Sequence, residues 1–482
     1  MTNITKTTPT QLILLWLGPM VMLLSCIIDP VGGMSVAAWR TAALAFWLAS
    51  WWVSEVVPIP ATSLLPLVIS PLAGIMPVAK VAAPYAHPLI FLFLGGFLLS
   101  IAMERWGLHK RIALNTMLRA GQTPSYQIMA MMGVTAFLSM WMSNTATAVM
   151  MLPIALSVIH LVKGQHADAS GFAKALLLAI AYGASIGGIA TLIGTPPNAL
   201  MAAYLADSYK IEIGFATWMM IGVPLSLVML LFTWFWLTKV AYKVDQQQQS
   251  VDTRSVFRQQ LSQLGTISRA ETGVLWVFGF AAIAWVFRPL LADWSGLELS
   301  DTGIAILAAL LLFVLPSGDE QQPRLLDWDH AAKVPWGILL LFGGGLSLAA
   351  QIKSSGLADY IAHLLADADT IPLLLSVLLV AGLITFLTEI TSNTATAAGF
   401  LPLLGPVAES LTGTPLVWVI PAAIAASCAF MMPVATPPNA IVFGSGELKM
   451  RDMINAGFAL NLVAIALITL VTMTLARVVL GF

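Results

Sequence analysis

Long apolar stretches separated by short polar segments run along nearly the whole chain. A helix needs roughly 20 apolar residues to cross a bilayer, and dividing the chain on that scale predicts eleven membrane-spanning helices. In order, the predicted spans are residues 12–28, 38–52, 58–75, 88–103, 173–204, 217–237, 270–287, 303–315, 334–350, 417–442 and 456–479. The pattern therefore predicts an all-α polytopic membrane protein.

Two further apolar segments, 126–161 and 371–408, are interrupted in the middle by the same polar hexapeptide. SNTATA stands at 143–148 and again at 392–397. A break at the midpoint predicts two re-entrant helical hairpins, because irregular backbone at membrane depth is tolerated only where it is buried in protein or lines a cavity. Unsatisfied polar groups in lipid cost several kcal/mol each. Two identical polar clusters therefore predict two halves that converge on one polar ligand, which is the layout of a transporter.

Lysine and arginine positions test this topology independently. With the N-terminus in the cytoplasm and the C-terminus outside, sixteen of the 22 basic residues fall inside and six fall outside, as the positive-inside rule requires. The six outside are Arg40, Lys80, Lys210, Arg288, Lys353 and Arg477. Five spans, an odd number, separate the hairpins. The first hairpin is therefore expected to open from the cytoplasm and the second from the exterior, as an inverted repeat.

The repeat extends beyond the hexapeptide. Residues 88–111 contain LFLGGFLLSIAMERWGLHKR and residues 335–362 contain LLFGGGLSLAAQIKSSGLADYIA, so glycine pairs and apolar runs match. Further on, GTPPN at 194–198 matches ATPPN at 435–439. Each half thus contains a glycine-paired span, a hairpin and a span interrupted by Thr-Pro-Pro-Asn.

The interrupted spans indicate where ligands bind. Proline cannot continue a helix without loss of backbone hydrogen bonds, so the fifth and tenth spans are expected to unwind near Pro196 and Pro437. Unwound segments expose carbonyl groups that bind cations, and half-helix N-termini expose amides that bind anions. Broken helices at matching places in the two halves predict the binding site.

Composition strengthens the membrane interpretation. Hydrophobic residues make up 59% of the 482 residues and charged residues 9%, whereas a soluble domain has roughly 25% charged residues. The net charge of −1 and the lack of a basic stripe argue against nucleic-acid binding. Cys26 and Cys428 lie in apolar spans, so no disulfide framework is expected. Residues 244–268, with Gln246–Gln249, are interpreted as a polar cytoplasmic linker.

The chain resembles the divalent anion:sodium symporters, the INDY-like family that carries dicarboxylates, citrate or sulfate. The resemblance covers nearly the whole chain and rests on both SNT motifs, both TPPN breaks, WWVSEVVPIPATSLLP at 51–66 and the glycine-paired block. It implies a scaffold domain that forms a homodimer and a transport domain that moves as an elevator. The corresponding regions are 1–121 (scaffold), 122–240 (transport), 241–270 (linker), 271–370 (scaffold) and 371–482 (transport). It also implies a place in the cell membrane, plasma or bacterial inner.

The family resemblance also implies the binding residues. One sodium site would use Ser139, Ser143, Asn144 and the backbone near Gly194, and the other would use Thr388, Ser392, Asn393 and the backbone near Ala435. The substrate carboxylates would contact Asn144, Thr145, Thr195, Pro196, Asn393, Thr394, Thr436 and Pro437. Two or more sodium ions would be transported with the anion.

The chemistry of these segments favours sodium coupling. Neither SNTATA segment and neither TPPN break contains Lys or Arg to offset a buried dianion, and sodium ions held by oxygen ligands would supply that charge. We therefore expect a symporter of C4-dicarboxylates such as succinate, malate or fumarate. The alternative on the same fold is a sodium-independent exchanger of dicarboxylates, tricarboxylates or sulfate. The number of sodium ions and the particular anion stay open.

Three further features have competing interpretations. GASIG at 183–187 matches the G-x-S-x-G pattern of hydrolases. It lies in an apolar span that contains no histidine, so close helix packing is the favoured interpretation and no enzyme is predicted. Glu389, beside the second motif, is either a proton relay or a structural hydrogen-bond acceptor that holds the hairpin tip, and the second is favoured because Met140 stands at the matching position. Glu55 is likewise expected to be structural.

Overall fold

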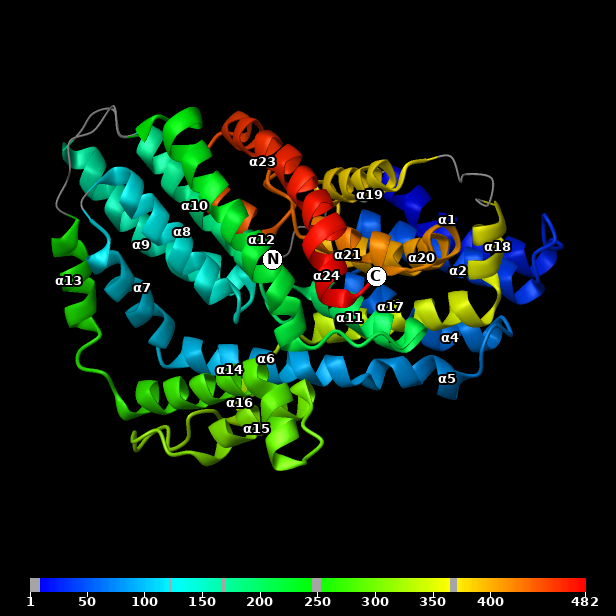
Figure 1. Cartoon of the computed structure of the whole chain (residues 1–482), viewed down its shortest axis with the longest axis horizontal. Helices are drawn as coiled ribbons and strands as arrows, with labels where there is room; N and C mark the ends of the chain where they lie inside the picture. Colours follow the sequence, from blue (N-terminus) through cyan, green and yellow to red (C-terminus); the bar gives the residue numbers. More distant parts are fainter. Residues whose placement is uncertain (1–8, 122, 166–169, 245–252, 365–370) are drawn as a thin grey trace.

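The computed structural model describes residues 9–121, 123–165, 170–244, 253–364 and 371–482, and within them the regular structure is helical apart from one isolated bridge between Pro316 and Arg324 (Figure 1). The first half comprises α1 (Pro9–Ile27), α2 (Val36–Ser54), α3 (Ile59–Thr62), α4 (Leu65–Leu72), α5 (Val78–Ala82), η1 (Ala83–Ala86), α6 (Pro88–Arg105), α7 (Leu108–Arg119), α8 (Pro124–Ser139), α9 (Asn144–Gln165), α10 (Ser170–Ile189), α11 (Pro196–Tyr209), α12 (Phe215–Phe235), η2 (Trp236–Ala241) and α13 (Arg254–Gln263). The second half comprises α14 (Arg269–Ser295), α15 (Asp301–Val314), α16 (Trp328–Ala331), α17 (Trp336–Ser354), α18 (Leu357–Leu364), α19 (Leu373–Thr388), α20 (Asn393–Thr412), α21 (Leu416–Ala425), α22 (Pro437–Phe443), α23 (Met450–Val471), η5 (Thr472–Ala476) and α24 (Arg477–Leu480).

Each predicted apolar span coincides with one helix or with consecutive helices. By length and composition, seven helical stretches in the described ranges are able to cross a membrane, and five shorter apolar helices of 10 to 17 residues accompany them. The seven include most of α9, which is one arm of the first predicted hairpin. Helix length alone therefore does not separate a hairpin arm from a full span.

The third predicted span, 58–75, is not one continuous helix. The chain forms α3 and α4, which are separated at Ser63 and Leu64. The interruption leaves backbone groups that need other partners. Tyr85 donates a hydrogen bond to the carbonyl of Ser63, and Trp52 Nε1 donates to Ser63 Oγ at 3.2 Å. These aromatic side chains stabilise a break that apolar run length did not reveal.

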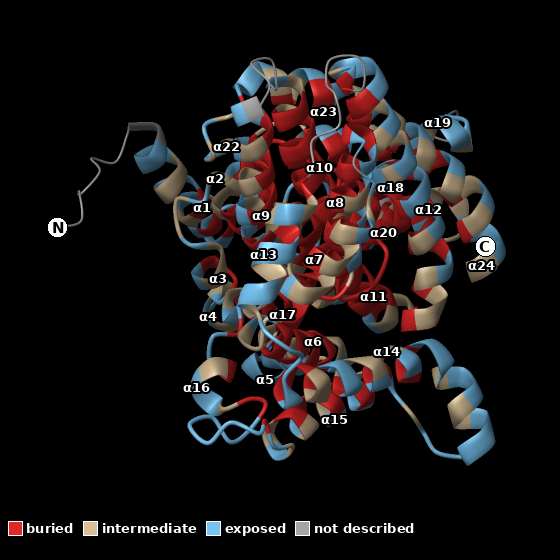
Figure 2. Ribbon diagram, turned by 90° about the vertical axis from the view of Figure 1, so that its left-hand side faces the viewer, coloured by how far each residue is buried: buried red, intermediate tan, exposed pale blue. Residues whose placement is uncertain are grey.

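The helices differ in how much of their apolar surface is buried inside the protein. Of the 18-residue apolar stretch of α10, 94% is buried. This helix packs against α8, α9, α12 and α22. Only 28% of the equally long apolar stretch of α14 is buried. The exposed side chains of α14 include Trp276, Leu290 and Trp294. Figure 2 shows buried residues concentrated in the middle of the molecule, at α10 and its neighbours. Large apolar side chains on the outside suit a lipid environment.

Small residues allow the close contact between α10 and α8. A Cβ atom added at Gly187 would lie 2.3 Å from the carbonyl oxygen of Ala136, and one added at Gly183 would lie 2.9 Å from that of Met132. Both approaches are too short for any side chain. The helix-packing interpretation of GASIG is therefore confirmed.

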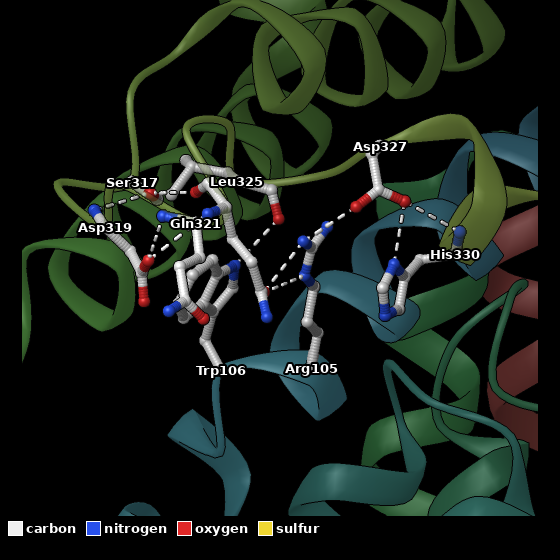
Figure 3. Close-up of polar contacts among 9 residues, drawn as sticks. Arg105, Trp106, Ser317, Asp319, Gln321, Leu325, Asp327 and His330 are labelled. Carbon is white, nitrogen blue, oxygen red and sulfur yellow. Dashed lines mark hydrogen bonds and ion pairs between the residues drawn. The ribbon is translucent and has the colours of Figure 1, made fainter.

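An ion pair fixes the end of α6 to the segment that precedes α17 (Figure 3). Arg105 pairs with Asp327 at 2.7 Å, and Trp106 Nε1 donates to the carbonyl of Leu325 at 2.7 Å. Burial alone would raise the pKa of Asp327, but hydrogen bonds from His330 and the charge of Arg105 lower it to about 2. The segment between α15 and α17 is thereby held against the glycine-paired helix α6.

The predicted linker at 244–268 is partly helical. It contains α13, which packs against α7 and buries Phe257. Gln246–Gln249 lie outside the described residues. An amphipathic helix explains the difference, because a polar segment needs only one apolar stripe to pack as a helix.

Candidate functional site

Both SNTATA motifs lie where one helix ends and the next begins. In the first half α8 ends at Ser139 and α9 begins at Asn144, and in the second half α19 ends at Thr388 and α20 begins at Asn393. Ser143 Oγ accepts a hydrogen bond from a backbone amide in the first turn of α9 at 3.2 Å, which is the usual role of an N-cap serine. Each motif thus places its polar residues in the first turn of a helix.

The predicted unwinding near Pro196 and Pro437 is confirmed. Residues 190–195 separate α10 from α11, and residues 426–436 separate α21 from α22. Proline fits the first position of a helix because the missing N–H would have no partner there. Each Thr-Pro-Pro-Asn therefore restarts a helix at its first proline.

The asparagine of each TPPN element stabilises the unwound segment. Asn198 Nδ2 donates to the carbonyl of Thr191 at 2.8 Å. In the second half, Asn439 Nδ2 donates to the carbonyls of Ala429 and Met432 at 3.1 and 3.0 Å. Buried carbonyls that lost their helical partners are thereby satisfied.

A cavity of about 660 Å³ lies where the four interruptions meet. All eight residues predicted to contact the substrate line it, namely Asn144, Thr145, Thr195, Pro196, Asn393, Thr394, Thr436 and Pro437. Four residues of the predicted sodium sites also line it, namely Ser143, Gly194, Ser392 and Ala435. Ser139 and Thr388 are buried behind this wall. Residues about 250 positions apart in the chain are thus brought together around one space.

Helix N-termini in the cavity wall supply positive potential. α9, α11 and α20 begin at Asn144, Pro196 and Asn393, and all three residues line the cavity. The N-terminus of a helix carries a partial charge of roughly +0.5. Among the described lining residues there is no Lys or Arg, and Glu55 is the one charged side chain. The wall favours anions through dipoles and hydrogen bonds.

Behind the first motif, oxygen atoms converge around the side chain of Asn144. Ser139 Oγ lies 2.6 Å from Asn144 Oδ1 and donates to the carbonyl of Ala184 at 2.7 Å. The inward amide atom of Asn144 also lies 3.2 Å from the Ala184 carbonyl oxygen and 3.1 Å from that of Gly194. With the amide nitrogen inward, these contacts are hydrogen bonds. With the amide oxygen inward, the four groups form an all-oxygen set of the kind that hard cations take.

The second motif repeats this arrangement. Thr388 Oγ1 donates to Asn393 Oδ1 at 2.8 Å and lies 2.9 Å from the carbonyl oxygen of Ala426. The hydroxyl precedes the asparagine by five residues in both halves. Two equivalent hydroxyl, amide and carbonyl sets therefore flank one cavity.

Glu389 is a structural hydrogen-bond acceptor, as the sequence predicted. Its carboxylate accepts hydrogen bonds from the backbone amides of Phe430, Met431 and Met432 at 2.7, 2.9 and 2.9 Å. Asn461 Nδ2 of α23 donates to it at 2.7 Å. The carboxylate thereby connects the end of α19 to the unwound segment between α21 and α22 and to α23.

Sequence reasoning did not identify several members of the site. The carbonyls of Ala184 and Ala426 belong to the oxygen sets, but any residue supplies a carbonyl, so no residue type marks them. Ser427 Oγ lies 3.3 Å from Thr195 Oγ1 and connects the two halves. The one sequence feature that could have indicated Ser427 was its hydroxyl, which lies close to the second TPPN element in the sequence. Phe93 and Phe97 of α6 form an apolar wall that the glycine-paired block did not indicate.

The fold and this cavity define a polytopic membrane transporter. The chain belongs to the sodium:sulfate symporter family: it matches the family described as "Sodium:sulfate symporter transmembrane region" over residues 10–481. The expected relationship to sodium-coupled anion symporters is thereby confirmed.

Relatives and solved structures agree with this membership. The chain is 42% identical over 480 residues to the sodium-dependent dicarboxylate transporter SdcS of Staphylococcus saprophyticus, covering 98% of this chain and 92% of that protein. It is 40% identical to SdcS of Staphylococcus aureus with the same coverage. The fold is similar to the Alcanivorax borkumensis YdaH transporter (TM-score 0.58, 14% identity, covering 96% and 98% of the two chains). It is also similar to Neisseria gonorrhoeae MtrF (TM-score 0.59, 15% identity, covering 97% and 95%).

Proposed function

We propose that the chain is a sodium-coupled symporter that imports C4-dicarboxylates such as succinate, malate or fumarate. The observation that carries the proposal is the pairing of equivalent Asn-Thr clusters, from 143–148 and 392–397, around one cavity without Lys or Arg among its described lining residues. Two polar clusters suit the two carboxylates of a short dianion. The 42% identical relative, a sodium-dependent dicarboxylate transporter, supports the same choice.

Sodium is proposed as the co-transported ion, with at least two ions per cycle. One site consists of Ser139, Ser143, Asn144 and the Gly194 carbonyl, and the other of Thr388, Ser392, Asn393 and the backbone at Ala435. The carbonyls of Ala184 and Ala426 are added to them, because each lies within 3 Å of the site's hydroxyl oxygen. Neutral oxygen ligands suit a hard monovalent cation, and the bound charge offsets the dianion.

The transport cycle is proposed to follow from the repeat. Eleven spans and two re-entrant hairpins form an inverted two-fold repeat, with the N-terminus cytoplasmic and the C-terminus outside. Segments 1–121 and 271–370 form a scaffold that dimerises, and segments 122–240 and 371–482 form an elevator-type transport domain. The positive-inside count and the matched interruptions of α10–α11 and α21–α22 support this arrangement.

The test is uptake of radiolabelled succinate by purified protein in proteoliposomes. An inward sodium gradient is compared with the same vesicles in choline. Uptake that requires sodium is the expected result. Uptake without sodium that requires internal dicarboxylate would replace symport with exchange, and uptake of sulfate or citrate alone would replace the substrate.

A further inference from the structure

Glu55 occupies an unusual backbone position at the edge of the cavity. It follows the last residue of α2 with φ 49° and ψ 24°, and its N–H donates to the carbonyl of Trp51 at 2.9 Å. Glycine adopts this left-handed conformation easily, whereas a side chain is strained in it. Such strain concentrates at functional sites, because the surroundings must enforce it. Lys210 adopts the same conformation at the end of α11, so a role for Glu55 has to come from the surroundings of its side chain.

The carboxylate of Glu55 has no structural partner. Glu55 is exposed, and its side chain makes no hydrogen bond or ion pair within the described part of the chain. Glu389, in contrast, is buried and accepts four hydrogen bonds. The structural role expected for Glu55 from the sequence therefore has no contact to support it.

The position of Glu55 in the wall gives the carboxylate an electrostatic role. The SNTATA and TPPN residues line the cavity, and the end of α2, α6 and α17 also contribute residues to its wall. The residues from these three elements are apolar at Val53, Phe93, Phe97 and Ile338 and polar at Ser54 and Glu55. Ser54 Oγ already donates to the carbonyl of Ser50 at 2.6 Å. An anion bound to the asparagines thus shares the cavity with one carboxylate.

We propose that Glu55 is a specificity-determining residue that sets the charge selectivity of the cavity. The inference rests on the proposed function, since it concerns the anion that the two motifs bind. Coulomb repulsion from Glu55 penalises each negative charge of the ligand that sodium does not offset. The cavity consequently prefers dianions over trianions of the same size, and it binds the dianion poorly until sodium is present. In a hydrated cavity we expect a two- to fivefold effect on affinity per ligand charge, weakened by salt.

Three substitutions at position 55 separate charge from backbone strain. Glu55→Gln removes the charge and keeps the strain. Glu55→Gly removes both, so it folds at least as well as the parent protein if the strain is as the φ angle indicates. Glu55→Asp keeps the charge. Ser54→Ala is the neighbouring control, because its hydroxyl is already bonded within α2.

The experiment measures inhibition of sodium-driven succinate uptake by tricarballylate and by its monoamide, which differ by one charge at nearly equal size. We expect the inhibition constant of tricarballylate, divided by that of its monoamide, to fall two- to fivefold in Glu55→Gln and Glu55→Gly. The same ratio should stay unchanged in Glu55→Asp and Ser54→Ala.

Two outcomes would overturn the inference. Unchanged ratios in the two neutral variants would remove the charge effect, and a ratio that falls equally in Glu55→Asp would show that the geometry at position 55, and not its charge, sets the selectivity. Either result leaves the proposed function intact, provided that the parent protein takes up succinate with sodium. Absence of succinate uptake by the parent protein itself would overturn the proposed function and the role of Glu55 with it.

Discussion

The two SNTATA hairpins present similar oxygen geometry, but different contacts hold the unwound segment beside each one. In the first half Thr191 Oγ1 donates to the carbonyl of Met140 and accepts from the amide of Gly194. In the second half the side chain at the position matching Met140 is Glu389, and it accepts hydrogen bonds from three backbone amides. In both halves the unwound segment donates, but the acceptor is a backbone carbonyl at Met140 and a side-chain carboxylate at Glu389. The ligand-facing groups are duplicated, whereas each half satisfies its unwound backbone in its own way.

The largest effect on transport is expected at the asparagine that each half has in its SNTATA motif. Asn144→Ala and Asn393→Ala should each reduce sodium-driven succinate uptake at least ~100-fold, because each removes an amide proposed to contact both ion and substrate. Uptake into proteoliposomes measures the loss. Size-exclusion profiles of the purified variants should match the parent protein, and normal transport by either variant would contradict the proposed site.

The residues at the two matching positions, Glu389 and Met140, should contribute differently to the stability of the protein. Glu389→Ala leaves one buried and two partly buried backbone amides, and the amide of Asn461, without their acceptor, so we expect the free energy of unfolding to fall by ~3–5 kcal/mol. Met140→Leu, at the matching position, should cost less than about 1.5 kcal/mol because volume and polarity are kept. Thermal unfolding in detergent gives the comparison. Equal losses in the two variants would mean that the halves are supported alike.

The hydroxyls behind the motifs should affect sodium binding equally in the two halves. Ser139→Ala and Thr388→Ala each remove a buried hydroxyl that contacts an asparagine amide. Since such a contact contributes about 1–1.5 kcal/mol, we expect roughly a tenfold rise in the sodium concentration for half-maximal uptake. Thr388→Ser retains the hydroxyl and should remain near the parent value. A sodium dependence that shifts in one half alone would show that the two sites are not equivalent.

The smallest effect is expected at Ser185, in the centre of GASIG. Its hydroxyl is buried and has no hydrogen-bond partner among the described residues. Ser185→Ala removes an unsatisfied polar group, so uptake should stay the same and the melting temperature should stay the same or rise slightly. Gly187→Ala is the matched contrast, because its Cβ would meet the Ala136 carbonyl oxygen at 2.3 Å. Loss of transport in Ser185→Ala would reopen a functional role for that serine.

The apolar pattern determined most of the fold, and duplication determined the location of the site. Apolar helices and the breaks at the two SNTATA motifs and before Pro196 and Pro437 were predictable, because apolar helices suit lipid and polar motifs and prolines interrupt them. The third predicted span coincides with the apolar stretch Ile59–Leu72, but the break at Ser63 and Leu64 within it was not predicted. At this break the Ser63 carbonyl accepts a hydrogen bond from Tyr85 and the Ser63 hydroxyl accepts one from Trp52, and only packing brings these donors there.

Within the site, the sequence by itself determined which polar side chains matter, because repeated hydroxyl and amide residues in apolar segments have few other uses. Only the tertiary structure decided which backbone groups complete the two oxygen sets. The carbonyls of Ala184 and Ala426 join them because the ends of α10 and α21 lie against the hairpins. That the carboxylate of Glu55 has no partner among the described residues is likewise visible only in the folded chain. Charge and hydrogen-bonding capacity are properties of residues, whereas the presence or absence of a partner is a property of their packing.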